Sequence, residues 1–416
     1  MKIAILGTRG IPGRYGGFET FAEQLSKRLV ARGHDVTVYC RRPFTDSGDV
    51  VDPRIRRVIL PTIQNKYIDT AFHTFLSVIH VVFTDVDLVF LCNVANSTLA
   101  WVPRLFGIPT VLHVDGLDRK RRKWNIFAQS YLFLCELLAL VTPTRIVTDA
   151  PSIHEYFRQR YNKRSAMIAY GAEVPEDSGT LEGFDLPKQK YILYVSRLEP
   201  ENNPELVIRA YKEVQTDWPL VIVGGNCYDG RFVRRLKLLA DRRVIFLGAI
   251  YGRRYWQLLQ NAGLFVSACE VGGIHPALIE AMVAGNAILY LDTPENQDTA
   301  TGCGVAFRQE VKDLATQMKR LLHDPGLREK LVQDAVSRAK SVFSWDEVTT
   351  QYETLFSELR AGKTATPVRS SVPADTCRPP DTGMQPVSAR VHANPVEGHD
   401  LRFRVSSAER TGKPTG

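Results

Sequence analysis

The first sixty residues constrain the fold most, because they alternate strand-like and helix-like patterns in the order used by α/β proteins. A β-branched run, KIAIL, is followed by a glycine-rich turn, an amphipathic segment, FETFAEQLSKRLVARG, and a second strand-like run, DVTVYC. Apolar residues recur at helical spacing in the middle segment, which ends at Gly33. This pattern predicts a βαβ unit and a parallel sheet with helices on both faces.

The same alternation occurs in two halves of the chain. LVFLC, TVLHVDG and RIVTDA continue the first set of strands, and KYILYVSRL begins a second set after a polar, turn-rich stretch at 175–187. At 416 residues and 44% hydrophobic composition, the chain exceeds what one core usually holds. We therefore predict an α/β protein with two doubly wound, Rossmann-like domains. Their expected bounds are 1–182 and 183–343, followed by an amphipathic helix at 344–361 and a disordered tail at 362–416.

Cysteine spacing and the apolar windows indicate a cytoplasmic protein. The seven cysteines are scattered and form no C-x-x-C pair, which is typical of reduced thiols. The N-terminus has no long apolar segment like that of a signal peptide. The most apolar window, 124–141, is interrupted by Gln129, Ser130 and Glu136, so we predict a buried helix, with a helix lying on a bilayer as the alternative.

The basic runs at 119–123 and 231–237 contribute to a net charge of +8 and would attract phosphate groups. No nucleic-acid-binding module accompanies them, so nucleic acid is not an expected partner. A solvated basic face is the simpler interpretation of both runs.

Ligands of open parallel sheets bind beyond the carboxyl ends of the strands, so the first candidate site is the glycine-rich loop after the first strand. Gly16 and Gly17 come just before the helix, whose positive end would face an anion held by this loop. The glycine spacing does not match a dinucleotide-binding fingerprint. Arg41 and Arg42 could still meet a 2′-phosphate, which leaves an NADP enzyme open, and a merely tight turn is the structural alternative.

His113 and Asp115 follow the strand TVLHV, where either side chain could position a hydroxyl or a leaving phosphate. Gly116 would let the chain turn with the Asp115 carboxylate exposed, whereas a lone histidine after a strand is often only structural. The D-x-D formed by Asp85 and Asp87 precedes its strand and would lie at the opposite edge of the sheet. We therefore predict neither a metal site nor a metal requirement.

In the second half, Arg197 ends the strand KYILYVS and could clamp a diphosphate with a guanidinium that stays charged. Asn203 stands at the start of the next helix. Further along, the Gly272–Gly273 turn and the helix opened by Pro276 would suit a phosphate. The Glu280 carboxylate on this helix could accept hydrogen bonds from two ribose hydroxyls.

These motifs resemble those of a known family. EVGGIHPALIEAMVAG resembles the donor-binding motif of retaining family 4 glycosyltransferases of the GT-B architecture. GTRGIPGRYGGFET, HVDGLDRKRRKW and RLEPENNPEL are similar to a bacterial subgroup that includes rhamnosyltransferases of surface and exported polysaccharides. The likeness covers residues 1–360 and implies a cleft between the domains, a donor held mainly by the second, an acceptor facing the first, and a last helix crossing back to the first.

The resemblance also assigns roles to individual residues. It implies that Glu280 holds the nucleotide ribose, that Arg197 binds the donor diphosphate, and that Gly16 and Gly17 lie near that diphosphate. His113 resembles a cleft histidine that takes part in the reaction in some members.

Two departures from the family pattern concern the donor site. The first glutamate of the usual motif is replaced by Gly272, with Glu270 two positions earlier, so amides around Gly272, Gly273 and His275 would take its place. The lysine that commonly follows the arginine is Asn202 or Asn203 here. We expect Arg9 or Arg14 to restore the missing charge.

The resulting prediction is a retaining, metal-independent glycosyltransferase without a cofactor. Its donor would be a dTDP- or UDP-sugar, and rhamnose is one candidate for the sugar. Its acceptor would be a glycan or a lipid-linked glycan. Residues 119–123 and Trp124 would dock it on anionic lipid at the inner face of the plasma membrane. The alternatives are a sugar-nucleotide epimerase or NADP oxidoreductase, and a non-catalytic nucleotide-binding partner of a polysaccharide assembly complex.

Overall fold

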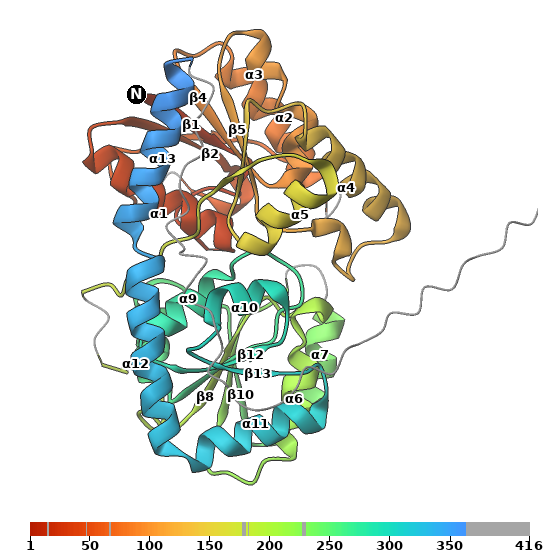
Figure 1. Cartoon of the computed structure of the whole chain (residues 1–416), viewed down its shortest axis with the longest axis vertical. Helices are drawn as coiled ribbons and strands as arrows, with labels where there is room; N and C mark the ends of the chain where they lie inside the picture. The colour runs from red at the N-terminus through yellow and green to blue at the C-terminus, as the bar shows by residue number, and fades with distance from the viewer. Residues whose placement is uncertain are drawn as a thin grey trace, which may run out of the picture. The chain divides into compact units, whose positions relative to one another are not determined.

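The computed structural model describes residues 1–362 except 15, 47, 66–67, 177–179, 182 and 227–229. It contains two parallel sheets, with strand orders β3-β2-β1-β4-β5-β6-β7 and β10-β9-β8-β11-β12-β13 (Figure 1). The predicted α/β class with two doubly wound sheets is confirmed. The predicted tail lies outside the described residues apart from Gly362.

The first sheet and its helices are built from residues before 170. Its strands are β1 (Lys2–Leu6), β2 (Asp35–Arg41), β3 (Arg56–Leu60), β4 (Leu88–Cys92), β5 (Thr110–Val114), β6 (Arg145–Thr148) and β7 (Ala166–Met167). Its helices are α1 (Gly17–Ala31), α2 (Asp69–Val81), α3 (Val102–Leu105), α4 (Ile126–Ala139) and α5 (Pro151–Tyr161).

The second sheet follows the same plan. Its strands are β8 (Ile192–Val195), β9 (Leu220–Val223), β10 (Val244–Gly248), β11 (Leu264–Ser267), β12 (Ala287–Leu291) and β13 (Val305–Phe307). Its helices are α6 (Pro204–Lys212), α7 (Gly230–Leu239), α8 (Gly252–Asn261), α9 (Pro276–Val283), α10 (Pro294–Ala300), α11 (Val311–His323) and α12 (Pro325–Val342), and α13 (Trp345–Arg360) ends the described chain.

The strand order fixes where a ligand can bind. It reverses between β1 and β4 in the first sheet and between β8 and β11 in the second. Crevices at such switch points open at the carboxyl ends of the strands. The first sheet therefore offers the loop before α1, and the second offers the segment after β8 and the loop before α9. The proposed domain division after residue 182 lies between β7 and β8 and stays a prediction.

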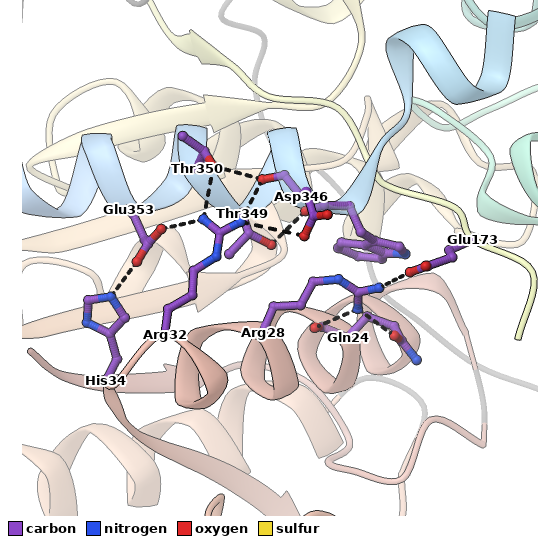
Figure 2. Close-up of polar contacts among 10 residues, drawn as sticks. Gln24, Arg28, Arg32, His34, Glu173, Asp346, Thr349, Thr350 and Glu353 are labelled. Atoms are coloured by element: carbon purple, nitrogen blue, oxygen red, sulfur yellow. Dashed lines mark hydrogen bonds and ion pairs between the residues drawn. The ribbon is translucent and has the colours of Figure 1, made fainter. Parts of the chain in front are cut away.

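The last helix, α13, packs on α1 of the first half. Figure 2 shows Arg32 and His34, at the end of α1 and just after it, converging on Glu353 of α13, with the His34 Nε2 to Glu353 Oε1 distance at 2.6 Å. Beneath this polar edge, Tyr352 and Phe356 are fully buried against Phe90 in an aromatic cluster. Apolar burial of this kind contributes more to docking than the partly exposed ion pairs do.

The prediction of a buried helix at 124–141 is wrong for most of its surface. One face of α4 is buried, but Phe127 is 82% exposed, Leu134 50% and Val141 68%. Phe83, just past α2, and Phe106, just past α3, contact each other edge to face with ring centroids 6.4 Å apart. Together these helices form what we call the apolar surface, whose exposed side chains are Phe75, Ile79, Phe83, Trp101, Leu105, Phe106, Ile126, Phe127, Tyr131, Phe133, Leu134, Leu137 and Val141.

Candidate functional site

The carboxyl edges of the two sheets meet through glycines. A Cβ atom on Gly17 would lie 2.9 Å from Pro276 Cγ, and one on Gly116 would lie 2.6 Å from the Gly272 carbonyl carbon. A Cβ on Gly273 would overlap the Asp149 carboxylate at the end of β6. Any side chain at these positions would push the two edges apart, so the sequence-predicted glycines are where the halves touch.

Two helices point their N-termini at this junction. α1 begins at Gly17 and α9 at Pro276, the two residues that face each other across it. No side chain caps either of these two described helix ends with a hydrogen bond. The backbone N–H groups of their first turns, which in α9 start at Ala277 because Pro276 has none, and the positive ends of their dipoles make the junction suited to an anion.

Cationic side chains from both halves add to this positive field. Arg197 follows β8, and its Nη1 lies 3.8 Å from Glu199 Oε2. Lys123, from the loop between β5 and α4, donates to both oxygens of the same carboxylate at 3.1 and 3.2 Å. Burial, Arg197 and Arg121 lower the pKa of Lys123 to about 8, with Glu199 acting in the opposite direction. These groups therefore lie close enough to act on one ligand.

Arg197 also acts on the residue that opens α9. Burial and, to a smaller extent, the charges of Arg121 and Arg197 lower the pKa of His275 to about 4. His275 is thus a neutral imidazole at physiological pH. Arg197 therefore lies near enough to the start of α9 for its charge to act on His275, and the donor-binding roles of Arg197 and the Gly272–Gly273 turn stay predictions.

Glu280 is held by a residue that sequence reasoning missed. The Tyr255 hydroxyl, from α8, donates a hydrogen bond of 2.6 Å to Glu280 Oε2. Burial raises the pKa of Glu280 to about 7, although the bond from Tyr255 favours the ionised form. Burial also raises the pKa of Tyr255 well above its ordinary value, so that this phenol remains a donor. Glu280 is therefore a positioned acceptor whose charge changes near neutral pH.

The structure separates His113 from the cleft edge that the sequence predicted for it. His113 is 1% exposed and packs between Phe21, Phe90 and Tyr170, with ring centroids 5.2 to 5.9 Å away. Its ring nitrogens make no hydrogen bond to any described residue. Burial alone lowers the pKa of His113 to about 3, so that the ring is neutral. Packed in this way, His113 does not reach the junction as a titratable group.

Asp115 lies closer to the junction than His113, but its carboxylate is not exposed as expected. One of its oxygens is enclosed and has no hydrogen-bond partner among the described residues. Burial and the neighbouring Asp118 raise the pKa of Asp115, while Arg121 and Arg197 oppose the rise. Asp149, which follows β6, is a second enclosed acid here, and burial and Asp115 raise its pKa well above the ordinary value.

The Asn203 side chain forms its hydrogen bonds with residues of the second half. Its side-chain amide donates to Ala268 O at 2.9 Å and to Glu270 Oε1 at 2.8 Å, and its oxygen accepts from Gln309. Glu270 also pairs with Arg122 at 3.0 Å. This predicted donor-binding residue therefore anchors the loops around the junction through its own amide.

The arginines expected to replace the missing lysine are engaged elsewhere. Arg14 pairs with Asp49 at 2.7 Å, and Arg9 is buried with its guanidinium 4.3 Å from the Phe44 ring centroid. Arg41, which left an NADP site open, forms a buried ion pair of 2.8 Å with Asp69. The structure places Lys123 beside Arg197 instead.

Most of the basic run at 119–123 is engaged in ion pairs, although Lys120 and Arg122 are exposed. Arg119 pairs with Glu136, Arg121 with Asp118, and Arg122 and Lys123 pair with acids of the second half. These side chains join parts of the fold. Docking of this run on lipid, with four of its five members engaged in ion pairs within the chain, stays a prediction.

Three residues of the site were missed by sequence reasoning: Lys123, Asp149 and Tyr255. Asp149 directly follows a strand, so the rule used for Asp115 could have found it. Lys123 was counted within a basic run, and only tertiary structure shows that it faces Arg197. Tyr255 carries no signal, because its α8 position gives no hint of Glu280.

The D-x-D behaves as a loop at the amino edge. Asp87 accepts from the Lys2 backbone amide at 2.8 Å, and Asp85 pairs with the Lys2 side chain. Within the described ranges, no group of three or more His, Cys, Asp or Glu residues is placed to hold a metal ion. No helix in the part of the chain that is described combines the length and apolar character needed to cross a bilayer.

Two family models match the chain and share it between them. Glycosyltransferase family 4 matches residues 15–171, and glycosyl transferases group 1 matches residues 183–338. A curated relative from Campylobacter jejuni is N-acetylgalactosamine-N,N'-diacetylbacillosaminyl-diphospho-undecaprenol 4-alpha-N-acetylgalactosaminyltransferase. It is 28% identical over 274 residues, which make up 62% of this chain and 72% of the relative.

Solved structures resemble the whole two-sheet arrangement. Sucrose-phosphate synthase from Thermosynechococcus elongatus has a TM-score of 0.70 at 20% identity and covers 87% of this chain and 100% of its own. HepE from Anabaena, in complex with UDP-glucose, has a TM-score of 0.68 at 18% identity and covers 86% of this chain and 100% of its own. At these identities the likeness shows the fold.

Proposed function

We propose that this chain, which belongs to the glycosyltransferases of the GT-B fold, transfers a sugar from a nucleoside-diphosphate donor to a glycan or lipid-linked acceptor with retention. The observation that carries the proposal is the convergence of Arg197 with two uncapped helix N-termini where the sheets meet. Such a site suits the negative charge that grows on a departing diphosphate. The sequence resemblance supports a polysaccharide-assembly enzyme and makes rhamnose a sugar to test.

The chemistry requires one bond to form and one to break at the anomeric carbon. The acceptor hydroxyl oxygen bonds to that carbon as the bond to the diphosphate oxygen breaks. The acceptor proton passes to the departing diphosphate. The protein's contribution is mainly electrostatic, because Arg197, the helix ends and the loop amides stabilise the leaving group.

The direct test is release of nucleoside diphosphate and transfer of labelled sugar by purified protein. The donors are dTDP-rhamnose, UDP-glucose and UDP-N-acetylgalactosamine, offered with short lipid-linked acceptors, with and without chelator. The donor that is used should raise the thermal midpoint, since a ligand at about one hundred times its Kd adds about 2.7 kcal/mol of stability. Nicotinamide-linked absorbance change without sugar transfer would favour the oxidoreductase alternative.

Glu280 should make donor binding depend on pH. Because burial raises its pKa to about 7, the acceptor carboxylate is fully formed only above that pH. We expect the Kd of the donor to decrease as pH rises from about 6 to about 8. Glu280→Gln should weaken binding by about tenfold and abolish this rise in affinity. Isothermal titration calorimetry across the pH range measures both effects.

Tyr255→Phe is the matched variant for this prediction. It removes the hydrogen bond that favours the Glu280 carboxylate, so the affinity should increase at a higher pH than in the wild type. A pH profile of Glu280→Gln that overlays the wild type would show that Glu280 does not contact the nucleotide.

The apolar surface supports the lipid-linked class of acceptor. Its helices present large apolar side chains at exposures of up to 82%. Large exposed apolar patches are typical of surfaces that bind proteins or membranes. The acids of α2 and α4, Asp69 and Glu136, are both buried. An anionic bilayer at the inner face of the plasma membrane therefore meets no exposed acid on these two helices. We assign membrane contact to this surface in place of residues 119–123.

A further inference from the structure

We propose that Lys123 is a second diphosphate-binding residue, supplied by the first half of the chain, and that Glu199 holds it beside Arg197. The inference rests on the proposed function and names one more contact within it. It explains how a donor site can work with asparagines at the two positions where the family pattern has a lysine.

The two asparagines are committed to supporting roles. Asn202 donates from its amide to the Arg197 carbonyl at 2.7 Å, and its own carbonyl accepts from the Tyr194 hydroxyl at 2.6 Å. Asn203 binds Ala268 and Glu270. Both therefore fix the loop that carries Arg197, and neither supplies a positive charge.

Glu199 ties the two cations together. Its carboxylate, which is almost wholly buried, accepts from Lys123 at 3.1 and 3.2 Å and lies 3.8 Å from Arg197. Burial would raise the pKa of Glu199, but Arg197 and Lys123 outweigh it and hold that pKa at about 2. The carboxylate is therefore ionised at every working pH and orients an ammonium and a guanidinium from opposite halves.

The local charges leave an excess that matches a diphosphate. Arg121, Arg197 and Lys123 carry three positive charges within one interacting group, while Asp118 and Glu199 carry two negative charges. Asp115 belongs to the same group and is only partly ionised near neutral pH, because burial and Asp118 raise its pKa to about 7. Glu201 lies 4.0 Å from Lys123 with its carboxylate buried, and burial raises its pKa toward the neutral form. The excess positive charge and the two helix N-termini would be balanced by a doubly negative group at the junction.

The source of Lys123 has a consequence for how the donor binds. Arg197 belongs to the second half, whereas Lys123 follows β5 of the first half. A diphosphate bound by both would join the halves directly. Donor binding would then use the same junction that Gly17, Gly116 and Gly273 keep close.

The test compares nucleoside diphosphates with nucleosides. Binding of UDP, dTDP and GDP, and of uridine, thymidine and guanosine, is measured by calorimetry for wild type, Lys123→Ala and Lys123→Arg. Lys120→Ala is the control, because Lys120 is an exposed lysine of the same loop. We expect Lys123→Ala to weaken the preferred diphosphate by about tenfold to hundredfold and to leave its nucleoside unchanged.

The pH profile separates a ligand contact from a structural role. With a Lys123 pKa of about 8, wild-type affinity for the diphosphate should fall as pH rises through that value, because the ammonium loses its proton. Lys123→Arg stays charged and should bind without this fall up to about pH 9.5. Thermal midpoints of all variants are measured alongside.

Three results would decide the matter. The role of Lys123 is overturned if Lys123→Ala binds the diphosphate like wild type. It is also overturned if this variant loses affinity for nucleoside and diphosphate equally. An alkaline fall that persists in Lys123→Arg does the same. Wild-type protein that prefers no diphosphate over its nucleoside instead overturns the proposed function itself.

Discussion

Replacing Arg197 by Ala is expected to lower kcat by about a hundredfold to a thousandfold while the protein stays folded. The reason is that a preorganised donor aimed at developing charge contributes about 3–4 kcal/mol to transition-state stabilisation. Arg197 adds to the field at the junction where His275 opens α9. Initial rates of nucleoside-diphosphate release at saturating donor measure the effect.

The environment of Arg197 predicts that this loss is catalytic and not structural. Glu199 keeps Lys123 as a partner in the variant, so no buried carboxylate is left uncompensated. Removing Arg197 also relieves its repulsion of Lys123, whose pKa should rise. Arg320→Ala, at an exposed position on α11, is the control for loss of an arginine. An Arg197→Ala enzyme with unchanged kcat would remove Arg197 from the mechanism.

The fold could be predicted from local pattern because its strands are buried on both faces. LVFLC is a continuous apolar run and TVLHV is mostly apolar, and each became a fully buried central strand, β4 and β5. The strand-end rule then located Arg197 and the Gly272–Gly273 turn, since parallel strands bring their carboxyl ends to one edge. These predictions needed only periodicity and topology.

Predictions failed where the outcome depended on which tertiary partner a side chain found. His113 stands one residue before the end of β5, and alternation along the strand turned it into the aromatic cluster, whereas Asp115 beyond the strand approaches the junction. The basic run at 119–123 looked solvated, but acids distant in sequence, such as Glu136 and Glu199, pair with it. Sequence spacing gives no information on such pairings.

The apolar surface should carry most of the free energy of membrane binding. Phe127→Glu combined with Leu134→Glu removes two exposed apolar side chains, each worth about 1.5–3 kcal/mol when fully buried, and adds two charges that anionic lipid repels. We expect wild-type protein to sediment with vesicles of phosphatidylglycerol and phosphatidylcholine, and the double variant to bind at least about a hundredfold more weakly. Transfer to a water-soluble acceptor should be unaffected in the variant.

Leu238→Glu is the matched control, because Leu238 on α7 is 89% exposed but belongs to the second half, away from the apolar surface. It should bind vesicles like wild type. Weaker binding by this variant would mean that loss of any exposed leucine has the same effect. Phe127→Glu and Leu134→Glu replace solvent-facing side chains of α4. The thermal midpoint of the double variant should therefore remain within a few degrees of the wild-type value. The wild-type protein could instead fail to bind vesicles and form a dimer that the double substitution dissociates. That result would assign the surface to a second copy of the chain. A bilayer would then have no part in covering it, and acceptor recognition would have to come from the junction alone.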